Sequence, residues 1–157
     1  MFAKDLMDLQ FHTLHPRQNI AEAVSAFQMA SESEKKKIFG MMVTDDNDLL
    51  VGMLSMYDIL NYVQPKHGSI LGEMEDLDFS QAYRGRLKNI RSIFVDDIMT
   101  TEVVTVGPDT HLMVIADIMI KKHIRRLPVV NNQKVLGIVY VSHVFYQVMT
   151  IFSSDPV

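Results

Sequence analysis

A serine and an aspartate three residues apart are the clearest candidates for chemistry in the sequence. Ser55 and Asp58 lie in segment 52–58 (GMLSMYD), which we expect to run from a strand into a helix that starts at Ser55. The pair could do no more than cap that helix, since an N-cap serine and a first-turn carboxylate bond each other's backbone groups. Alternatively, the helix N–H groups and the serine hydroxyl could face a phosphate while Asp58 accepts both hydroxyls of a ribose. The residues alone leave both interpretations open.

Two adjacent arginines form a second candidate element. Arg125 and Arg126 directly precede the apolar segment 127–130, and two neighbouring guanidinium groups cannot both enter a core. Together with Lys121 and Lys122, they could be simply the solvated start of a strand. Arginine is also suited to phosphate because its planar fork donates two parallel hydrogen bonds.

Other chemistries have little support. The absence of cysteine excludes disulfides, thiolate nucleophiles, cysteine zinc sites and iron–sulfur clusters. His12 and His15 are close in sequence, but Pro16 breaks the helix that would align them, so a metal site is a minor alternative. The acidic run 45–48 lacks the glycine and distal glutamate of a calcium loop and predicts a charged hairpin turn. No P-loop, GxGxxG or serine-hydrolase motif is present.

The composition is that of one ordinary globular domain with a fair-sized core. The chain has 157 residues, of which 48% are hydrophobic and 22% charged. A net charge of -4 argues against a dedicated nucleic-acid binder, and we interpret the lysines 35–37 as a solvated helix end. No apolar run reaches 18 residues, and the first residues lack the basic start of a leader. We therefore expect a cytoplasmic protein that binds neither nucleic acid nor membrane.

The sequence repeats itself, and the repeat organises the chain. Three offsets carry it: 92 aligns 3–7 with 95–99, 86 aligns 35–41 with 121–127, and 85 aligns Gly52 with Gly137. The drop from 92 to 86 places a six-residue insertion in the first copy, around 29–34. We expect repeats at 1–60 and 95–157, joined by a linker at 61–94.

Each copy is predicted to be β-α-β-β-α. In the second copy the predicted elements are a strand at 103–106, a helix that starts at 108–110, strands at 127–130 and 135–139 around a turn, and a closing helix at 141–152. We expect four apolar residues of the closing helix to point inward: Val144, Phe145, Val148 and Ile151. The linker shows 3/4 apolar spacing from Phe79 to Ile90, with acids before it at 73–78 and bases further along at Arg84, Lys88 and Arg91. It predicts an amphipathic helix that spans between the copies, with a lid or partner-docking helix as the alternative.

This organisation resembles a tandem CBS (cystathionine-β-synthase) domain pair, also called a Bateman module. The resemblance covers 1–60 and 95–150 and is carried by the doubled element order and four segments: 52–60 (GMLSMYDIL), 97–100 (DIMT), 104–110 (VTVGPDT) and 124–130 (IRRLPVV). It implies an α+β fold of two pseudo-symmetric repeats packed through their sheets. It also implies a regulatory sensor of adenosyl ligands with two clefts, no catalysis of its own and no catalytic cofactor.

The resemblance also implies roles for individual residues. Ser55 and Asp58 would contact the phosphate and sugar of a ligand whose phosphate is reached from the other repeat by Arg125 and Arg126. We expect the purine slot to be lined by four further residues: Met53, Ile124, Gln10 and Phe11.

The second cleft is expected to differ. It would use Tyr140 and His143 where the family has the hydroxyl and carboxylate, and Phe39 and Gly40 where it has basic residues. The cleft has thus lost its ribose acceptor, its small hydroxyl and its phosphate cations. We therefore infer one nucleotide per chain, with a different ligand in the second cleft as the alternative, and interpret His143 by itself as a helix-surface histidine.

Three classes of function follow from these residues. A ligand sensor would bind an adenine nucleotide such as AMP, ADP or ATP; a structural dimerisation module would have an empty cleft; an enzyme would turn a substrate over. We expect a homodimer, because the predicted helices carry apolar faces on two sides and twelve methionines provide adaptable surface. Since the repeats fill the chain, we expect regulation to act on a separate effector protein.

Overall fold

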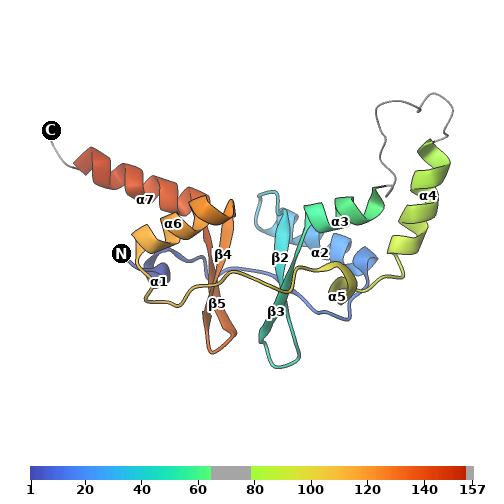
Figure 1. Ribbon diagram of the computed structural model, residues 1–157, viewed down its shortest axis with the longest axis horizontal. Helices are drawn as coiled ribbons and strands as arrows, with labels where there is room; N and C mark the ends of the chain where they lie inside the picture. The colour runs from blue at the N-terminus through green and yellow to red at the C-terminus, as the bar shows by residue number, and fades with distance from the viewer. Residues whose placement is uncertain (65–78, 155–157) are drawn as a thin grey trace. The chain divides into compact units, whose positions relative to one another are not determined.

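The computed structural model describes residues 1–64 and 79–154, with side chains for all of these except 79–83. The fold is α+β, as predicted, and Figure 1 shows its elements. Seven helices and five strands lie in the described residues: α1 (Ala3–Leu6), β1 (Thr13–Leu14), α2 (Ile20–Ser33), β2 (Gly40–Thr44), β3 (Leu50–Ser55), α3 (Met56–Val63), α4 (Phe79–Ile90), α5 (Val95–Ile98), α6 (Leu112–Lys122), β4 (Arg126–Asn131), β5 (Lys134–Tyr140) and α7 (Val141–Ser154).

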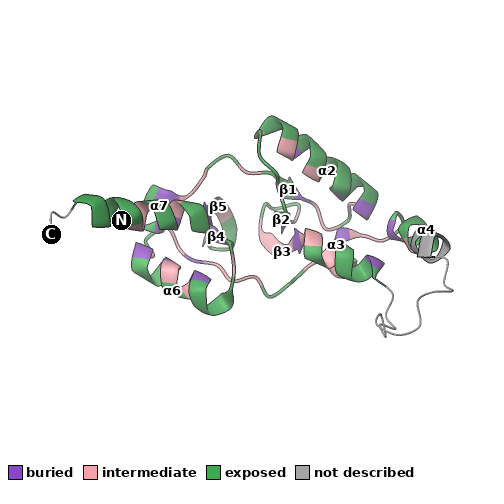
Figure 2. Cartoon of the chain, turned by 90° about the horizontal axis from the view of Figure 1, so that it is seen from above, coloured by how far each residue is buried: buried purple, intermediate pink, exposed green. Residues whose placement is uncertain are grey.

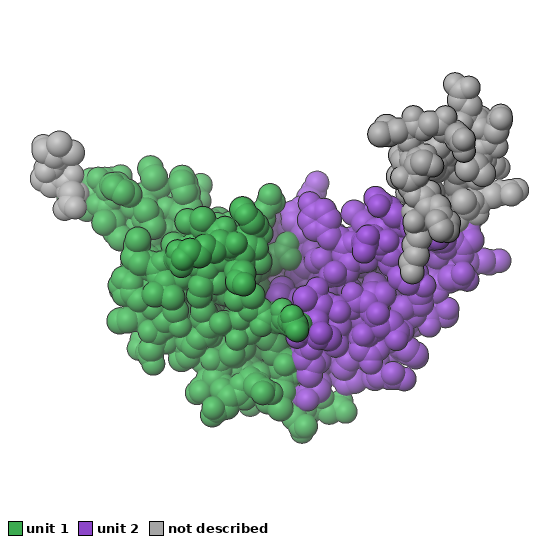
Figure 3. Space-filling view, in the orientation of Figure 1, with its two compact units in different colours: residues 1–12, 46–50, 102–157 green, residues 13–45, 51–101 purple. Residues whose placement is uncertain are grey.

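The chain divides into two compact units, coloured separately in Figure 3. Unit 1 contains residues 1–12, 46–50 and 102–157, and unit 2 contains residues 13–45 and 51–101. Each unit has its own cluster of buried apolar side chains. Each therefore has a core of its own.

Unit 2 is built on a three-stranded sheet with the order β1-β2-β3. β1 runs parallel to β2, and all five residues of β2 are buried, as expected for an apolar strand covered on both faces. Helix α2 starts at a capping box in which Glu22 N–H donates to the Asn19 side chain and Asn19 N–H donates to the Glu22 carboxylate, both at 2.9 Å. The helix buries one face, including Ile20 and Ala23, and leaves the other exposed (Figure 2).

Unit 1 is built on the antiparallel hairpin β4-β5. Its turn residues Asn132 and Gln133 have φ values of 49° and 66°, the left-handed pair that suits the twist of a two-residue hairpin loop. Helix α6 buries Leu112, Ile115 and Met119. It ends at His123, which adopts the left-handed conformation common at helix C-termini.

The two shortest helices lie outside the unit formed by the rest of their own repeat. Helix α1 belongs to unit 1, where Asp8, just after it, exchanges two backbone hydrogen bonds with Ile138 at 2.8 and 3.1 Å. Helix α5 belongs to unit 2, where Thr100 exchanges the corresponding pair with Met53 at 2.8 and 2.9 Å. Both bonded pairs obey the 92- and 85-residue offsets read from the sequence. Each compact unit therefore combines residues from both predicted repeats, 1–60 and 95–157.

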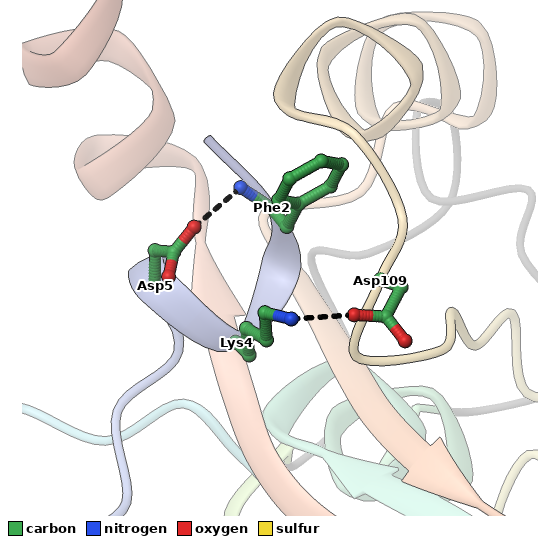
Figure 4. A network of polar contacts seen from close by, with 4 residues as sticks. All are labelled: Phe2, Lys4, Asp5 and Asp109. Atoms are coloured by element: carbon green, nitrogen blue, oxygen red, sulfur yellow. Dashed lines mark hydrogen bonds and ion pairs between the residues drawn. The ribbon is translucent and has the colours of Figure 1, made fainter.

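Polar contacts at the surface add to the attachment of α1. The Asp5 carboxylate accepts from Phe2 N–H at 2.8 Å, and Lys4 Nζ lies 2.7 Å from the carboxylate of Asp109 (Figure 4). Asp109 raises the pKa of Lys4, mainly through that hydrogen bond and then through its charge. Since both side chains are largely exposed, the pair contributes little compared with the burial of Ala3 and Leu6.

The short helices α1 and α5 and the residues just after them, which pack in the unit of the other repeat, are called the exchanged segments. Two equivalent glycines make room for them. A Cβ atom at Gly137 would lie 2.8 Å from the Asp8 carbonyl oxygen and 2.9 Å from the Met7 side chain. A Cβ atom at Gly52 would lie 2.5 Å from the Met99 sulfur and 2.9 Å from the Thr100 carbonyl oxygen. Each strand is therefore restricted to glycine at the point where a methionine-bearing segment crosses it.

Two local expectations were wrong. Residues 103–106 make only a single parallel bridge, from Val106 to Val129, rather than a strand. Extending that pairing towards Val104 would need an N–H from Pro128, and proline has none. The first repeat has Met42 at the equivalent position and forms the strand β1 there.

The second wrong expectation concerns the inward face of α7. Val144 is buried and Val148 half-buried as expected, but Phe145 and Ile151 are 57% and 52% exposed. The described end of α4 at Ile90 agrees with the predicted linker helix.

Candidate functional site

Ser55 and Asp58 form a complete capping box at the start of α3. Ser55 N–H donates to Asp58 Oδ2 at 2.7 Å, and the Ser55 hydroxyl donates to the same oxygen at 2.8 Å. In return, Asp58 N–H donates to Ser55 Oγ at 3.3 Å. Ser55 has the extended backbone of an N-cap residue, and both side chains are half-buried. The capping interpretation of the sequence is therefore realised in the structure.

The capping bonds leave hydrogen-bonding capacity unused. Both bonds that reach the Asp58 carboxylate end on Oδ2, and Oδ1 makes none to any residue that the structure describes. Within the same described residues, Tyr57 N–H at the first turn of α3 also has no acceptor, while Met56 N–H donates to the Phe39 carbonyl at 2.9 Å. One carboxylate oxygen and one helix N–H are thus available to a ligand.

Strand β3 brings Met53 to the same side as Ser55. Residues two apart on a strand share a face, and Met53 and Ser55 are both half-buried while Leu54 between them is fully buried. The exposed Phe39 lies at the same helix start, since its carbonyl accepts from Met56. Unit 2 therefore has Met53 and Ser55 on one face of β3, the Asp58 carboxylate in the first turn of α3 and the Phe39 backbone at the same helix start.

Unit 1 holds the arginine pair at the corresponding position. Arg126 lies opposite Tyr140 in the β4-β5 register, and Val141 N–H donates to the Arg125 carbonyl at 2.9 Å. Arg125 is exposed and Arg126 half-buried, and neither forms an ion pair with any described residue. Burial lowers the pKa of Arg126; Tyr140 opposes that effect and the charge of Arg125 adds to it. The second arginine is therefore a partly desolvated cation without a carboxylate among the described residues.

Tyr140 and His143 take the places of Ser55 and Asp58 in unit 1. Their rings meet edge to face with centroids 5.4 Å apart, and His143 Nδ1 lies 3.2 Å from the Leu6 carbonyl oxygen. His143 lies in the first turn of α7 and keeps part of its surface exposed, and its ring also contacts helix α1, a contact that the sequence did not indicate. The 92-residue offset aligns Leu6 with Ile98 of the second repeat. It did not predict that the Leu6 carbonyl would contact His143.

Two equivalent hydrogen bonds confirm the residue alignment behind the asymmetry. Met56 N–H donates to the Phe39 carbonyl in unit 2, and Val141 N–H donates to the Arg125 carbonyl in unit 1, with offsets of 85 and 86. Phe39 therefore occupies the position that Arg125 has in the other unit. One helix start carries a serine, an aspartate and a phenylalanine, and the other a tyrosine, a histidine and arginines.

The remaining predicted slot residues all belong to unit 1. Ile124 packs against the core of that unit and Phe11 is half-buried, while Gln10 is exposed and its N–H donates to Asp8 Oδ1 at 2.9 Å. The structure thus brings Met53, Ser55 and Asp58 together in unit 2 and places the other predicted residues in unit 1. The proposed sharing of one ligand between the two sets stays a prediction.

Metal and membrane interpretations receive no support from the described residues. In that part of the chain no three histidine, aspartate or glutamate side chains gather as a metal site would need. His15 Nδ1 accepts from Arg17 N–H at 3.2 Å, which is a local turn contact. Over the same residues, none of the helices has the length and apolar character to cross a bilayer.

Comparison with known proteins now decides the family. A family model of the CBS domain matches residues 3–65 and 95–150, one match for each repeat. The chain belongs to the CBS-domain family. It is a tandem CBS pair, as the repeated segments predicted.

Relatives of this CBS pair include plant and other CBS-domain proteins. The CBS domain-containing protein CBSX2, chloroplastic, of Arabidopsis thaliana is 30% identical over 133 residues, covering 78% of this chain and 56% of that protein. The chain therefore spans little more than half the length of this relative. A crystal structure of CBSX2 in complex with AMP matches with a TM-score of 0.69 at 24% identity, over 96% of this chain and 98% of that one. The CBS pair of protein MJ0100, in complex with 5′-methylthioadenosine and S-adenosyl-L-methionine, matches with a TM-score of 0.67 at 21% identity, over 96% and 98%.

Proposed function

We propose that this CBS pair is a regulatory module that binds one adenine nucleotide per chain and transmits its occupancy to a separate effector protein. Asp58 holds the two ribose hydroxyls, and Ser55 with the first turn of α3 faces the phosphate. Arg125 and Arg126 neutralise the phosphate charge. The module has no catalytic activity of its own, so incubation with ATP should leave the nucleotide chemically intact.

The contrast between the two helix starts is the observation that carries the proposal. Asp58 keeps one oxygen unused by capping, and a ribose diol needs a carboxylate with acceptor capacity to spare. Its counterpart His143 already contacts the Leu6 carbonyl and has no carboxylate. Only the α3 start can therefore accept both hydroxyls of a sugar.

The arginine pair supports a phosphate on the ligand. The half-buried guanidinium of Arg126 has lost part of its hydration. Hydrogen bonds from this guanidinium to an anion would therefore be favourable. Arg126 has no such anion among the described residues. The ligands named for the related structures, AMP, 5′-methylthioadenosine and S-adenosyl-L-methionine, share an adenosine group, which agrees with recognition of its ribose.

Calorimetric titration with AMP, 2′-deoxy-AMP and S-adenosyl-L-methionine tests the proposal. Asp58→Ala should weaken AMP binding by about 1.5–3 kcal/mol, the range for hydrogen bonds to a charged group. Wild-type protein should prefer AMP to 2′-deoxy-AMP, and the variant should lose that preference.

Glu22→Ala is the matched control, because Glu22 is the acid of an equivalent capping box in the same unit. It should cost similar helix stability and leave AMP affinity unchanged. A complete capping box also suits a purely structural module. That alternative would be favoured if wild-type protein bound none of the three ligands, or if both variants lowered affinity equally.

We further propose that α7 mediates a homodimer. The helix contains no charged residue, and one side of it exposes five large apolar or aromatic side chains: Val141, Phe145, Tyr146, Met149 and Phe152. Their spacing over three turns places them on one continuous face of the helix. Exposing an apolar face of this kind to water costs free energy, so such a face is typical of an interaction surface. A second copy of α7, itself uncharged, offers a complementary surface.

Light scattering tests the dimer. Wild-type protein at micromolar concentration should have twice the mass of the 17.9 kDa chain. Phe145→Glu with Met149→Glu should give the monomer mass, because two carboxylates would be buried without partners. Met29→Glu on α2, also an exposed methionine, should leave the dimer intact. A monomeric wild-type protein would contradict the proposal.

A further inference from the structure

Helix α4 carries a basic face for which the nucleotide site gives no reason. Arg84, Leu87, Lys88 and Arg91 follow the i, i+3, i+4, i+7 spacing of one helix face, with Arg91 one residue beyond the end of the helix. The three cationic residues are exposed, and Leu87 is 48% exposed. The described end of α4 is largely exposed in Figure 2. The face is thus an apolar side chain bordered by three positive charges.

The other side of α4 explains why this face points outward. Ile90 is buried in the core of unit 2, and Arg86 Nη1 donates to the carbonyl of Gln64, the residue that ends α3. At 100° per residue, Arg86 and Ile90 lie on the side opposite Arg84 and Lys88. The helix is therefore fixed through Arg86 and Ile90, and the basic face is not needed to hold it.

The basic face has no counter-charge in the described residues. None of Arg84, Lys88 and Arg91 makes an ion pair or side-chain hydrogen bond to any residue of 1–64 or 84–154. By contrast, Lys121 on α6 pairs with Asp117 one turn away at 2.8 Å. Three like charges on adjacent turns repel one another, so binding an anionic partner would relieve the repulsion.

The character of the partner follows from the charge balance and from Leu87. The whole chain carries -4, so its long-range field opposes a polyanion such as nucleic acid or an anionic bilayer. A short acidic segment senses mainly the local charges, because screening limits the field to about 10 Å at 0.1 M salt. The exposed leucine adds an apolar contact that a helix with acidic residues around one apolar residue can fill.

We propose that the α4 basic face docks an acidic amphipathic helix of a partner protein. Glutamates or aspartates of that helix pair with Arg84, Lys88 and Arg91, and an apolar side chain packs on Leu87. The docking surface is independent of the proposed nucleotide site and would stand if that site proved empty.

Fluorescence anisotropy with a synthetic probe tests the proposal. The probe is a labelled helical peptide of about 18 residues, long enough to be helical alone, with glutamates at i, i+4 and i+7 around a leucine at i+3. Wild-type protein should bind it, and Arg84→Gln with Lys88→Gln and Arg91→Gln should weaken binding about tenfold, or about 1.4 kcal/mol. Leu87→Ala alone should weaken it several-fold, by up to about 1 kcal/mol.

The matched control removes three exposed lysines elsewhere: Lys35→Gln, Lys37→Gln and Lys122→Gln. It should bind the peptide within about twofold of wild type, and a peptide with the same residues scattered over all faces should bind neither protein tightly. Circular dichroism of the α4 variant checks its fold independently of any nucleotide. The proposal is overturned if wild-type protein does not bind the peptide, if both triple variants lose equal affinity, or if the α4 residues instead confer tighter binding to phosphatidylglycerol vesicles or to a single-stranded oligonucleotide.

Discussion

Replacing Gly137 with alanine should destabilise the protein by about 3–5 kcal/mol, because the new methyl group would occupy the path of the segment that follows α1. The Cβ atom would lie 2.8 Å from the Asp8 carbonyl oxygen and 2.9 Å from Met7 Cγ and Sδ. The methionine can move, but the carbonyl is held by the hydrogen bond it accepts from Ile138 N–H at 3.1 Å. The strand or the segment must therefore shift.

The magnitude follows from what the shift disturbs. Overpacking a filled site costs about 1–3 kcal/mol. Lengthening the two Asp8–Ile138 hydrogen bonds adds about 1 kcal/mol for each bond. Gly137 does not have a positive φ, so alanine adds no backbone strain there. Gly52→Ala should behave similarly, since Thr100 crosses Gly52 in the same way at 2.9 Å.

Urea unfolding followed by circular dichroism provides the assay, with two internal controls. A Cβ atom at Gly107 or Gly85 would meet no heavy atom within 4 Å. Gly107→Ala should change stability by less than about 0.5 kcal/mol, and Gly85→Ala, inside α4, should gain up to about 1 kcal/mol. The packing of exchanged segments on these strands is refuted if Gly137→Ala is as stable as wild type, or if Gly107→Ala loses as much.

Three further outcomes are expected. Gln133→Gly should stabilise the protein by about 0.5–1 kcal/mol in the same urea assay, because Gln133 has a φ of 66° in the β4-β5 turn; a loss of stability would contradict that turn geometry. Arg125→Ala with Arg126→Ala should weaken AMP binding and flatten its dependence on salt, whereas His143→Ala should leave affinity unchanged; an unaltered salt slope in the double variant would remove the arginines from the site. Asp109 raises the pKa of Lys4, so the stability that the pair contributes is present below the ordinary lysine pKa of about 10.4 and is lost as the pH rises through the higher folded value. Thermal melts should therefore show a steeper alkaline loss for wild type than for Asp109→Asn, and parallel curves would refute the pairing.

Local patterns predicted most of the fold correctly. Apolar runs around a turn gave β4 and β5, and helical spacing gave α4 and the extent of α7, because these depend on residues near one another in sequence. The 85- and 86-residue offsets recur as hydrogen bonds of the same kind in both units. The repeat was therefore as informative as any single motif.

Contacts between distant segments could not be predicted in the same way. The assignment of α1 to unit 1 depends on pairing between Asp8 and Ile138, which no local pattern encodes. Pro128 was visible in the sequence, but its effect on residues 103–106 required knowing which strand they meet. Phe145 was predicted to be inward because helical spacing marks apolar faces without showing which one is covered.

The sequence predicted which residues form the candidate site better than it predicted their hydrogen bonds and burial. The spacing of Ser55 and Asp58 gave the capping box, and the structure added that capping uses one carboxylate oxygen and leaves the other. The half-burial of Arg126 opposite Tyr140 depends on the β4-β5 register, which sequence spacing does not fix.

A crystal structure of the protein grown with AMP would test the central claim most directly. The account predicts one AMP per chain, with both ribose hydroxyls on the Asp58 carboxylate and the phosphate near Ser55, Arg125 and Arg126. AMP bound against Tyr140 and His143 with Asp58 unoccupied, or two equivalent AMP molecules per chain, would contradict it.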